Sequence, residues 1–105
     1  MKIHEVKIQE RFADAIAEGR KRFEIRKNDR AYQTGDVLRF RVVEDGTGVP
    51  SIRTQKHPMD GQFAEISYVL SGWGLKNGYV ALGIREVERE RLKQIKEGSN
   101  EHSDQ

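Results

Sequence analysis

Cysteine is absent from this chain of 105 residues, and its absence removes three kinds of chemistry. Without a thiol the chain can form no disulfide, no thiolate zinc site and no cysteine nucleophile. The three histidines, His4, His57 and His102, do not fall at metal-ligand spacing, and the sequence has neither a D-x-D nor an H-E-x-x-H motif. No glycine-rich phosphate loop is present either. We therefore expect no metal and no cofactor.

Long hydrophobic runs are absent too. The first residues alternate charged and apolar groups without an apolar run of the kind that a secretory signal needs. No stretch approaches the length of a transmembrane helix. These features predict a cytoplasmic protein that has no membrane partner.

Hydrophobic residues make up only 35% of the chain, against 34% charged residues, but they gather in short periodic runs. That pattern is typical of one folded domain with a polar tail rather than of general disorder, and we expect a monomer. The formal net charge of +2 is too small to predict a nucleic-acid partner. Its distribution is more informative, because basic residues crowd one segment: Arg20, Lys21, Arg22, Arg26, Lys27 and Arg30.

Alternation of apolar and polar residues predicts an α+β fold that is mainly β. We expect a helix over residues 9–18, stopped by Gly19, and strands over residues 2–8, 21–27, 37–43, 64–70 and 79–87. The side chains expected to face the core are His4, Val6, Ile8, Leu38, Phe40, Val42, Ala64, Ile66, Tyr68, Leu70, Val80, Leu82 and Ile84. About five to six short strands with one early helix indicate a small, partly closed β-barrel.

The remaining segments are predicted to be loops and a tail. Glycine and proline punctuate residues 44–62, where we expect a long loop with one short strand near residues 51–54 and a solvated His57. The domain should end near residue 88. We expect residues 89–105 to be a charged tail that is partly helical or disordered. Residues 88–96 are typical of a charged helix with too little apolar periodicity to dock firmly, and we expect disorder beyond Gly98.

The most informative stretch is the predicted strand over residues 21–27. Side chains alternate between the faces of a strand, so Arg22, Glu24 and Arg26 should share one face while Phe23 and Ile25 point into the core. A carboxylate between two guanidiniums orders both and directs their donors outward, toward a phosphate or a base edge. Two interpretations stay open, a surface ion-pair ladder and a binding site, and the ladder is the more common arrangement.

This stretch resembles the G-x-K-x-x-E-x-R signature of the ASCH domains, small members of the PUA-like superfamily. The four matching residues are Gly19, Lys21, Glu24 and Arg26. The resemblance covers about residues 2–88, except for 44–62. Within the family, the chain looks closest to an uncharacterised ASCH-like branch found in phage and bacterial genomes. It implies a PUA-like barrel that binds RNA or a modified nucleotide in a cleft between the early helix and the barrel.

On that resemblance, Lys21, Glu24 and Arg26 would line the cleft. Lysine and arginine neutralise phosphates, and an exposed Trp73 would stack on a base. The residues expected to assist electrostatically are Arg22, Arg39 and Arg41. Tyr32 and Tyr79 could also stack, although packing inside the barrel is the commoner role of tyrosine.

An enzyme is the second reading. Some ASCH-like proteins are amidohydrolases that act on acylated cytidine with a lysine, a threonine and a glutamate, and others are described as ribonucleases. Here Lys21 stands at the lysine position, but Glu24 occupies the place of the threonine. Glu65, expected on a solvated strand face, is the candidate later carboxylate for metal-independent hydrolysis. A protein-interaction module is a third possibility, because it would need no motif.

Overall fold

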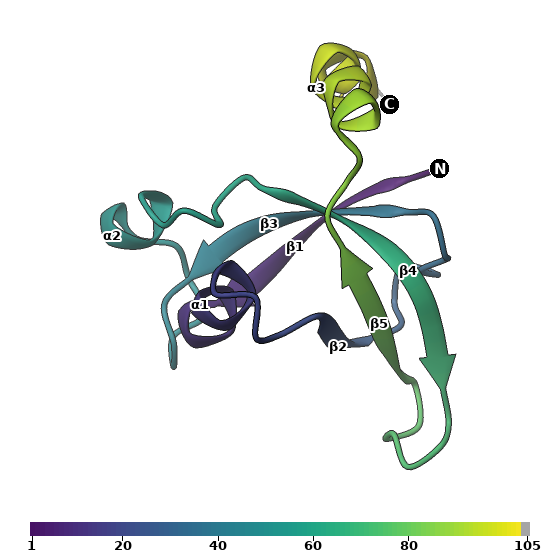
Figure 1. The fold of residues 1–105 in the computed structure, drawn as a ribbon. Coiled ribbons are helices and arrows are strands. Elements are labelled where there is room, and N and C mark those ends of the chain that lie inside the picture. Colours follow the sequence, from purple (N-terminus) through teal and green to yellow (C-terminus); the bar gives the residue numbers. More distant parts are fainter. Residues whose placement is uncertain (104–105) are drawn as a thin grey trace.

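One strongly curled sheet forms the body of the protein. The computed structural model describes residues 1–103 and has five strands in the order β1-β3-β4-β5-β2 (Figure 1). The elements are β1 (Ile3–Gln9), α1 (Glu10–Ala17), β2 (Phe23–Lys27), β3 (Val37–Val43), α2 (Ile52–Gln55), β4 (Phe63–Ser71), β5 (Tyr79–Arg85) and α3 (Arg89–Ser103). The predicted mainly β fold with a partly closed barrel is confirmed. Within residues 1–103, no helix is long and apolar enough to cross a membrane.

The sheet mixes one parallel pair with three antiparallel pairs. β1 and β3 run parallel, with Ile3 opposite Val37 and Gln9 opposite Val43. A parallel pair needs a crossover, and the chain makes it through α1 and β2. β2 then pairs with β5 rather than with β1. The two ends of the sheet are therefore β1 and β2, which follow one another closely in the sequence.

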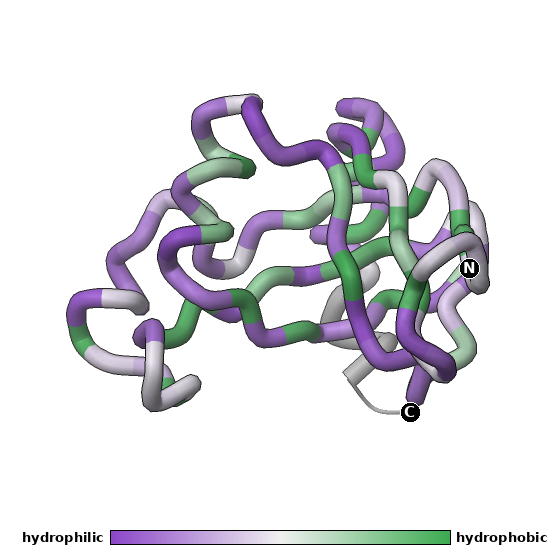
Figure 2. The backbone as a smooth tube through the Cα atoms, turned by 90° about the horizontal axis from the view of Figure 1, so that it is seen from below, coloured by the Kyte–Doolittle hydropathy of each residue, from purple (hydrophilic) through white to green (hydrophobic). Residues whose placement is uncertain are grey.

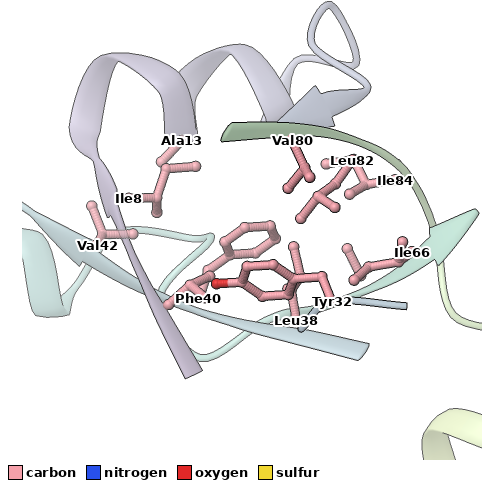
Figure 3. Close-up of a cluster of buried hydrophobic side chains, with 12 residues drawn as sticks. Ile8, Ala13, Tyr32, Leu38, Phe40, Val42, Ile66, Val80, Leu82 and Ile84 are labelled. Carbon is pink, nitrogen blue, oxygen red and sulfur yellow. The ribbon is translucent and has the colours of Figure 1, made fainter. Parts of the chain in front are cut away.

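The core lies inside this curl, as the sequence pattern predicts. Leu38, Phe40 and Val42 are fully buried, and Val80 and Leu82 meet them from β5 (Figure 3). The other core members include Val6, Ile8, Ala13, Tyr32, Ala64, Ile66 and Ile84. Figure 2 shows the sequence basis of this core, because short hydrophobic stretches alternate with hydrophilic ones along the chain.

A β-bulge in β4 changes which side chains face the core. Ala64 and Ile66 are buried as predicted, but the pairing with β5 shifts between Ile66 and Tyr68. Tyr68 is 63% exposed, whereas Val69 packs on the core. The prediction that Tyr68 and Leu70 face inward is wrong, since one extra residue exchanges the two faces of the strand.

The long loop holds a short helix where we expected a strand. α2 begins after Ser51, whose side chain accepts a hydrogen bond from the Thr54 amide at 3.1 Å. Thr54 in turn accepts from the Ser51 amide at 2.8 Å, which completes a capping box. The prediction of a solvated His57 is wrong as well, because its side chain is 9% exposed and bonds to Asp14 at 2.6 Å.

α3 packs on the open end of the barrel, contrary to the expectation of an undocked tail. Ile95 is buried against Val37 and Val87, and Leu92 packs beside them. Two apolar residues three apart suffice for one narrow contact stripe. The helix continues to Ser103, past Gly98, where we expected disorder, and residues 104–105 lie outside the described part of the chain.

The turn before β3 joins the start of the chain to the barrel. Gly35 has a φ of 94°, a conformation that glycine adopts without strain. It places the Asp36 carboxylate where it accepts from the Lys2 amide at 3.1 Å and bonds to His4 at 2.9 Å. Burial opposes the charge of Asp36, but these hydrogen bonds and one from the Gln33 amide outweigh it, so the pKa of Asp36 lies below its usual value.

Candidate functional site

The two faces of β2 are exchanged relative to the prediction. Glu24 is only 5% exposed and points into the barrel, whereas Phe23 and Ile25 are 48% and 53% exposed. The register explains this, because Glu24 stands opposite the buried Leu82 and Arg26 opposite the buried Val80. Our prediction that Phe23 and Ile25 face the core is wrong. The inward carboxylate is tolerated because two cations accompany it.

Lys21, Glu24 and Arg26 form one ion-paired cluster, which we call the KER cluster. One carboxylate oxygen of Glu24 bonds to Lys21 Nζ, and the other accepts from Arg26 Nη1 at 3.1 Å. The side chains of Lys21, Glu24 and Arg26 are 13%, 6% and 24% exposed, so the cluster is more buried than a surface ladder. Two cations facing one carboxylate leave a formal excess of one positive charge.

Two aromatic rings enclose the ammonium group of Lys21. Its Nζ lies 4.9 Å from the centre of the Phe23 ring and 5.4 Å from that of Phe12. It also donates to the Phe23 carbonyl at 2.5 Å. Cation–π contacts of this kind orient the ammonium group. α1 thus contributes to the cluster through Phe12, a residue that the sequence analysis did not select.

Arginine side chains connect the two ends of the sheet. Arg26 Nη1 donates to the Lys7 carbonyl of β1 at 2.9 Å, and Arg30 Nη1 donates to the Glu5 carbonyl of the same strand. We call this junction between β1 and β2 the seam. Since β1 and β2 do not pair with each other, guanidinium groups take the place of a strand-to-strand ladder there.

A cleft of about 510 Å³ opens along the seam, between the end of β1, the start of α1 and β2. Its walls include the whole KER cluster. The other lining residues are Lys7, Ile8, Gln9, Phe12, Phe23, Ile25, Lys27, Asp29, Arg30, Tyr32 and Tyr79. The sequence predicted that the three KER residues belong together, and the structure gathers them in this cleft.

The other predicted cations lie elsewhere. Arg41 binds Glu5 at 2.6 Å and Asp60 at 3.2 Å on the outer face of β1 and β3, opposite the core. Arg39 shares that face, with its guanidinium 6.0 Å from the Phe63 ring. Arg22 is exposed and lines a second groove on the far side of Lys21. Of these three, none lines the cleft.

Of the three aromatic residues singled out in the sequence, two line the cleft and one does not. Trp73 is 89% exposed in the loop between β4 and β5, as predicted, but it is not a cleft residue. Tyr32 packs in the core, edge-on to His4 at 4.8 Å between ring centres, and it also lines the cleft. Tyr79 is partly buried and lines the cleft.

Glu65 lies apart from the KER cluster. We expected a solvated carboxylate, but Glu65 is 8% exposed, and its two oxygens bind Arg85 and Arg91. The hydrogen bond from Arg85 is the main cause that holds the pKa of Glu65 below its usual value. Lys21 instead bonds to Glu24, so the described residues contain no direct Lys21–Glu65 interaction. A low pKa and two bound arginines make Glu65 a poor general base.

Cations and aromatic rings make up most of the lining of the cleft. Among residues 1–98, whose side chains the structure describes, no three His, Asp or Glu side chains gather in a way that could hold a metal ion. Lys7 and Phe12 contribute to the cleft but were missed in the sequence, and Arg30 was counted in the basic segment without being assigned to the cleft. Local pattern could not place them there, because only the curl of the sheet brings β1 against the loop after β2.

Comparisons with known proteins give a family and one phage relative. Residues 3–84 match the family described as a domain of unknown function (DUF3850). An uncharacterized 12.9 kDa protein in the GpA 3' region of Escherichia phage P2 is 54% identical over 37 residues. That match spans 35% of this chain and 34% of the phage protein, about a third of each. The family match covers the barrel and every residue that lines the cleft.

Proposed function

The chain belongs to the DUF3850 family, and from the geometry of its cleft we propose that it binds RNA or a modified nucleotide beside the KER cluster. The observation that carries the proposal is the excess of cations around an opening with aromatic walls. Lys7, Lys27 and Arg30 join the KER cluster there, while Asp29 is the one further acid in the lining. Phosphate groups bind at such a site by charge, and bases bind by stacking.

Arg26 has hydrogen-bond donors to spare for a ligand. Both of its hydrogen bonds leave from Nη1, toward Glu24 and the Lys7 carbonyl. A guanidinium carries five N–H groups, so Nη2 and Nε remain able to contact a phosphate or a base carbonyl. Glu24 fixes the orientation of the group, which lowers the entropy lost when a ligand binds.

The free edge of β2 adds main-chain groups to this wall. Arg22 accepts from the Ile84 amide and Asn28 donates to the Gly78 carbonyl, so the even-numbered residues of this strand bond to β5. The N–H and C=O of Ile25, which alternates with them, therefore point away from β5 toward the cleft. A paired donor and acceptor of this kind can bond to the edge of an unpaired base.

The resemblance to ASCH domains agrees with this proposal. Three of the four signature residues, Lys21, Glu24 and Arg26, line the cleft, and Gly19 does not. We favour binding over hydrolysis, because Glu65 is engaged by two arginines. Hydrolysis of RNA or of acylated cytidine is the alternative, and the same experiment tests it.

The test is a titration of labelled single-stranded RNA, hairpin RNA and nucleoside monophosphates by fluorescence polarisation or calorimetry, at several salt concentrations. We expect wild-type binding that weakens with salt. Phe12→Ala removes a cleft ring and Arg26→Lys removes the guanidinium, and both should weaken binding. Lys93→Ala, an exposed cation on α3, should not.

Folding of each variant is checked by circular dichroism, so that lost binding is not confused with lost structure. RNA binding that is equal in the wild type, Phe12→Ala and Arg26→Lys would show that the cleft is not the site. The mixtures are also analysed for products after prolonged incubation. Products that disappear in Lys21→Ala would replace the binding proposal with the hydrolase.

A further inference from the structure

The outside of β2, β5 and β4 carries an exposed apolar surface. We call this surface the outer face. Its residues form two rows across the strands. Phe23, Gly83 and Tyr68 make up the first row, and Ile25, Ala81 and Leu70 make up the second. None of the six carries a charge.

The middle strand, β5, carries only small residues on this face, so the side chains of β2 and β4 protrude beside it. β5 contributes only Gly83 and Ala81, and Tyr68 is seated against Gly83, where an added Cβ would lie 3.6 Å from the Tyr68 Cβ and 2.8 Å from the Ser67 hydroxyl. Phe23 is 48% and Tyr68 63% exposed, so no described element covers the rings. The β4 bulge is the cause, since it turns Tyr68 outward.

The outer face is continuous with the cleft. Phe23 and Ile25 belong to both, because they stand on the edge strand β2. Beyond the second row, Lys27 stands opposite Tyr79, and the Lys76 ammonium lies 5.7 Å from the centre of the Tyr79 ring. Cations therefore border the aromatic face on the side where it meets the cleft.

We infer that a single strand of RNA held in the cleft continues across the outer face, where two successive unpaired bases stack on Phe23 and Tyr68. This inference rests on the proposed function and extends its site. Neighbouring strands lie about 4.8 Å apart, so β2 and β4 are separated by about 10 Å, which is too far for one base to cover both rings. Bases in a duplex already stack on each other, so only an unpaired strand fits.

Exposed rings with cations at their border favour nucleic acid over a protein partner. Stacking on an open aromatic ring needs no matching shape and tolerates any base. A stable protein interface would need a larger and more complementary apolar surface than these six residues provide.

The experiment compares two ligands and two variants of Tyr68. We expect Tyr68→Ala to weaken binding of an octameric single-stranded RNA about fivefold or more, the effect of losing one stacked base. Binding of a nucleoside monophosphate, which reaches only the cleft, should be unchanged. Tyr68→Phe keeps the ring and should bind the octamer like the wild type. Because Tyr68 is exposed, both variants should fold.

Failure of this inference and failure of the proposed function give different results. If neither ligand binds the wild type, the proposed function is wrong, and the inference, which rests on it, is wrong too. If both ligands bind, Phe12→Ala weakens both and Tyr68→Ala weakens neither, only the path over the outer face is wrong. A wild-type dimer in sedimentation that Tyr68→Ala dissociates would assign the face to a second copy of the chain and also overturn the inference.

Discussion

Replacement of Arg26 by alanine tests whether the seam is a structural joint. The variant loses two hydrogen bonds from one guanidinium, to the Glu24 carboxylate and to the Lys7 carbonyl. Hydrogen bonds to charged groups contribute about 1.5–3 kcal/mol each. The Arg26 side chain is 24% exposed and Glu24 keeps Lys21, so the low end of that range applies. We expect a loss of about 3 kcal/mol in the free energy of unfolding.

The assay is urea unfolding followed by circular dichroism, with thermal unfolding beside it. In a domain of this size about 3 kcal/mol lowers the Tm by about 10 °C or more. Arg26→Lys keeps the charge but loses the planar fork, so it should lie between the wild type and alanine. Lys27→Ala, an exposed neighbour on the same strand, is the control and should stay within about 0.5 kcal/mol. A loss below about 1 kcal/mol in Arg26→Ala would refute the structural role of the seam.

Two further predictions concern the ends of the barrel. Asp36→Asn should cost about 1–3 kcal/mol at neutral pH, because it removes a buried charge that accepts three hydrogen bonds. The pKa of Asp36 is lowered in the folded state, so its contribution to the free energy of unfolding is complete above about pH 4 and is lost as the pH falls through the folded pKa. Unfolding measured at several pH values should therefore show that acid lowers the stability of the variant less than that of the wild type. Equal losses of stability in acid would contradict the assignment. Ile95→Ala should cost about 2–4 kcal/mol if α3 is a stable part of the domain, whereas Gln94→Ala on its exposed side should cost little. Hydrogen exchange should then show faster exchange in α3 in Ile95→Ala, and unchanged unfolding would mean that the helix contributes nothing.

The sequence was sufficient where one face of a strand is apolar and the other polar. β1, β3 and β5 follow that rule, since His4, Leu38 and Val80 begin alternating inward sets that are buried as predicted. The α1 helix ends before Gly19, which has a φ of 79°. These elements depend on local periodicity alone, so a single sequence specifies them.

The failures have physical causes that local periodicity does not contain. In β2 either face of the strand could point into the barrel on pattern alone. The face that carries Glu24 points inward, because Glu24 is paired with two cations there. In β4 the bulge at Ser67 inverted the pattern halfway along the strand. Among the described residues of α3, Leu92 and Ile95 make the apolar contacts, a stripe too narrow to be recognised among the charges of the helix. Arg91 adds an ion pair to Glu65.

The candidate site was predictable in its charged centre but not in its surroundings. Lys21, Glu24 and Arg26 stand close together in the sequence, so their grouping follows from one strand. Phe12 and Arg30 join them only through the curl of the sheet. Arg39 and Arg41 were assigned to the same basic surface, but they lie on the side of β3 that faces away from the core, where Arg41 binds two acids.

The seam also bears on how this protein avoids aggregation. A sheet that stops short of closure has two strands with unsatisfied edges, and such edges recruit strands from other molecules. Here β1 and β2 face the same narrow cleft, and two guanidiniums occupy the Glu5 and Lys7 carbonyls. A neighbouring chain would have to displace both arginines before it could add a strand to β1. Loss of Arg26 and Arg30 together should therefore expose the edge of β1 as a template for intermolecular pairing, and the first sign should be oligomers that grow with protein concentration.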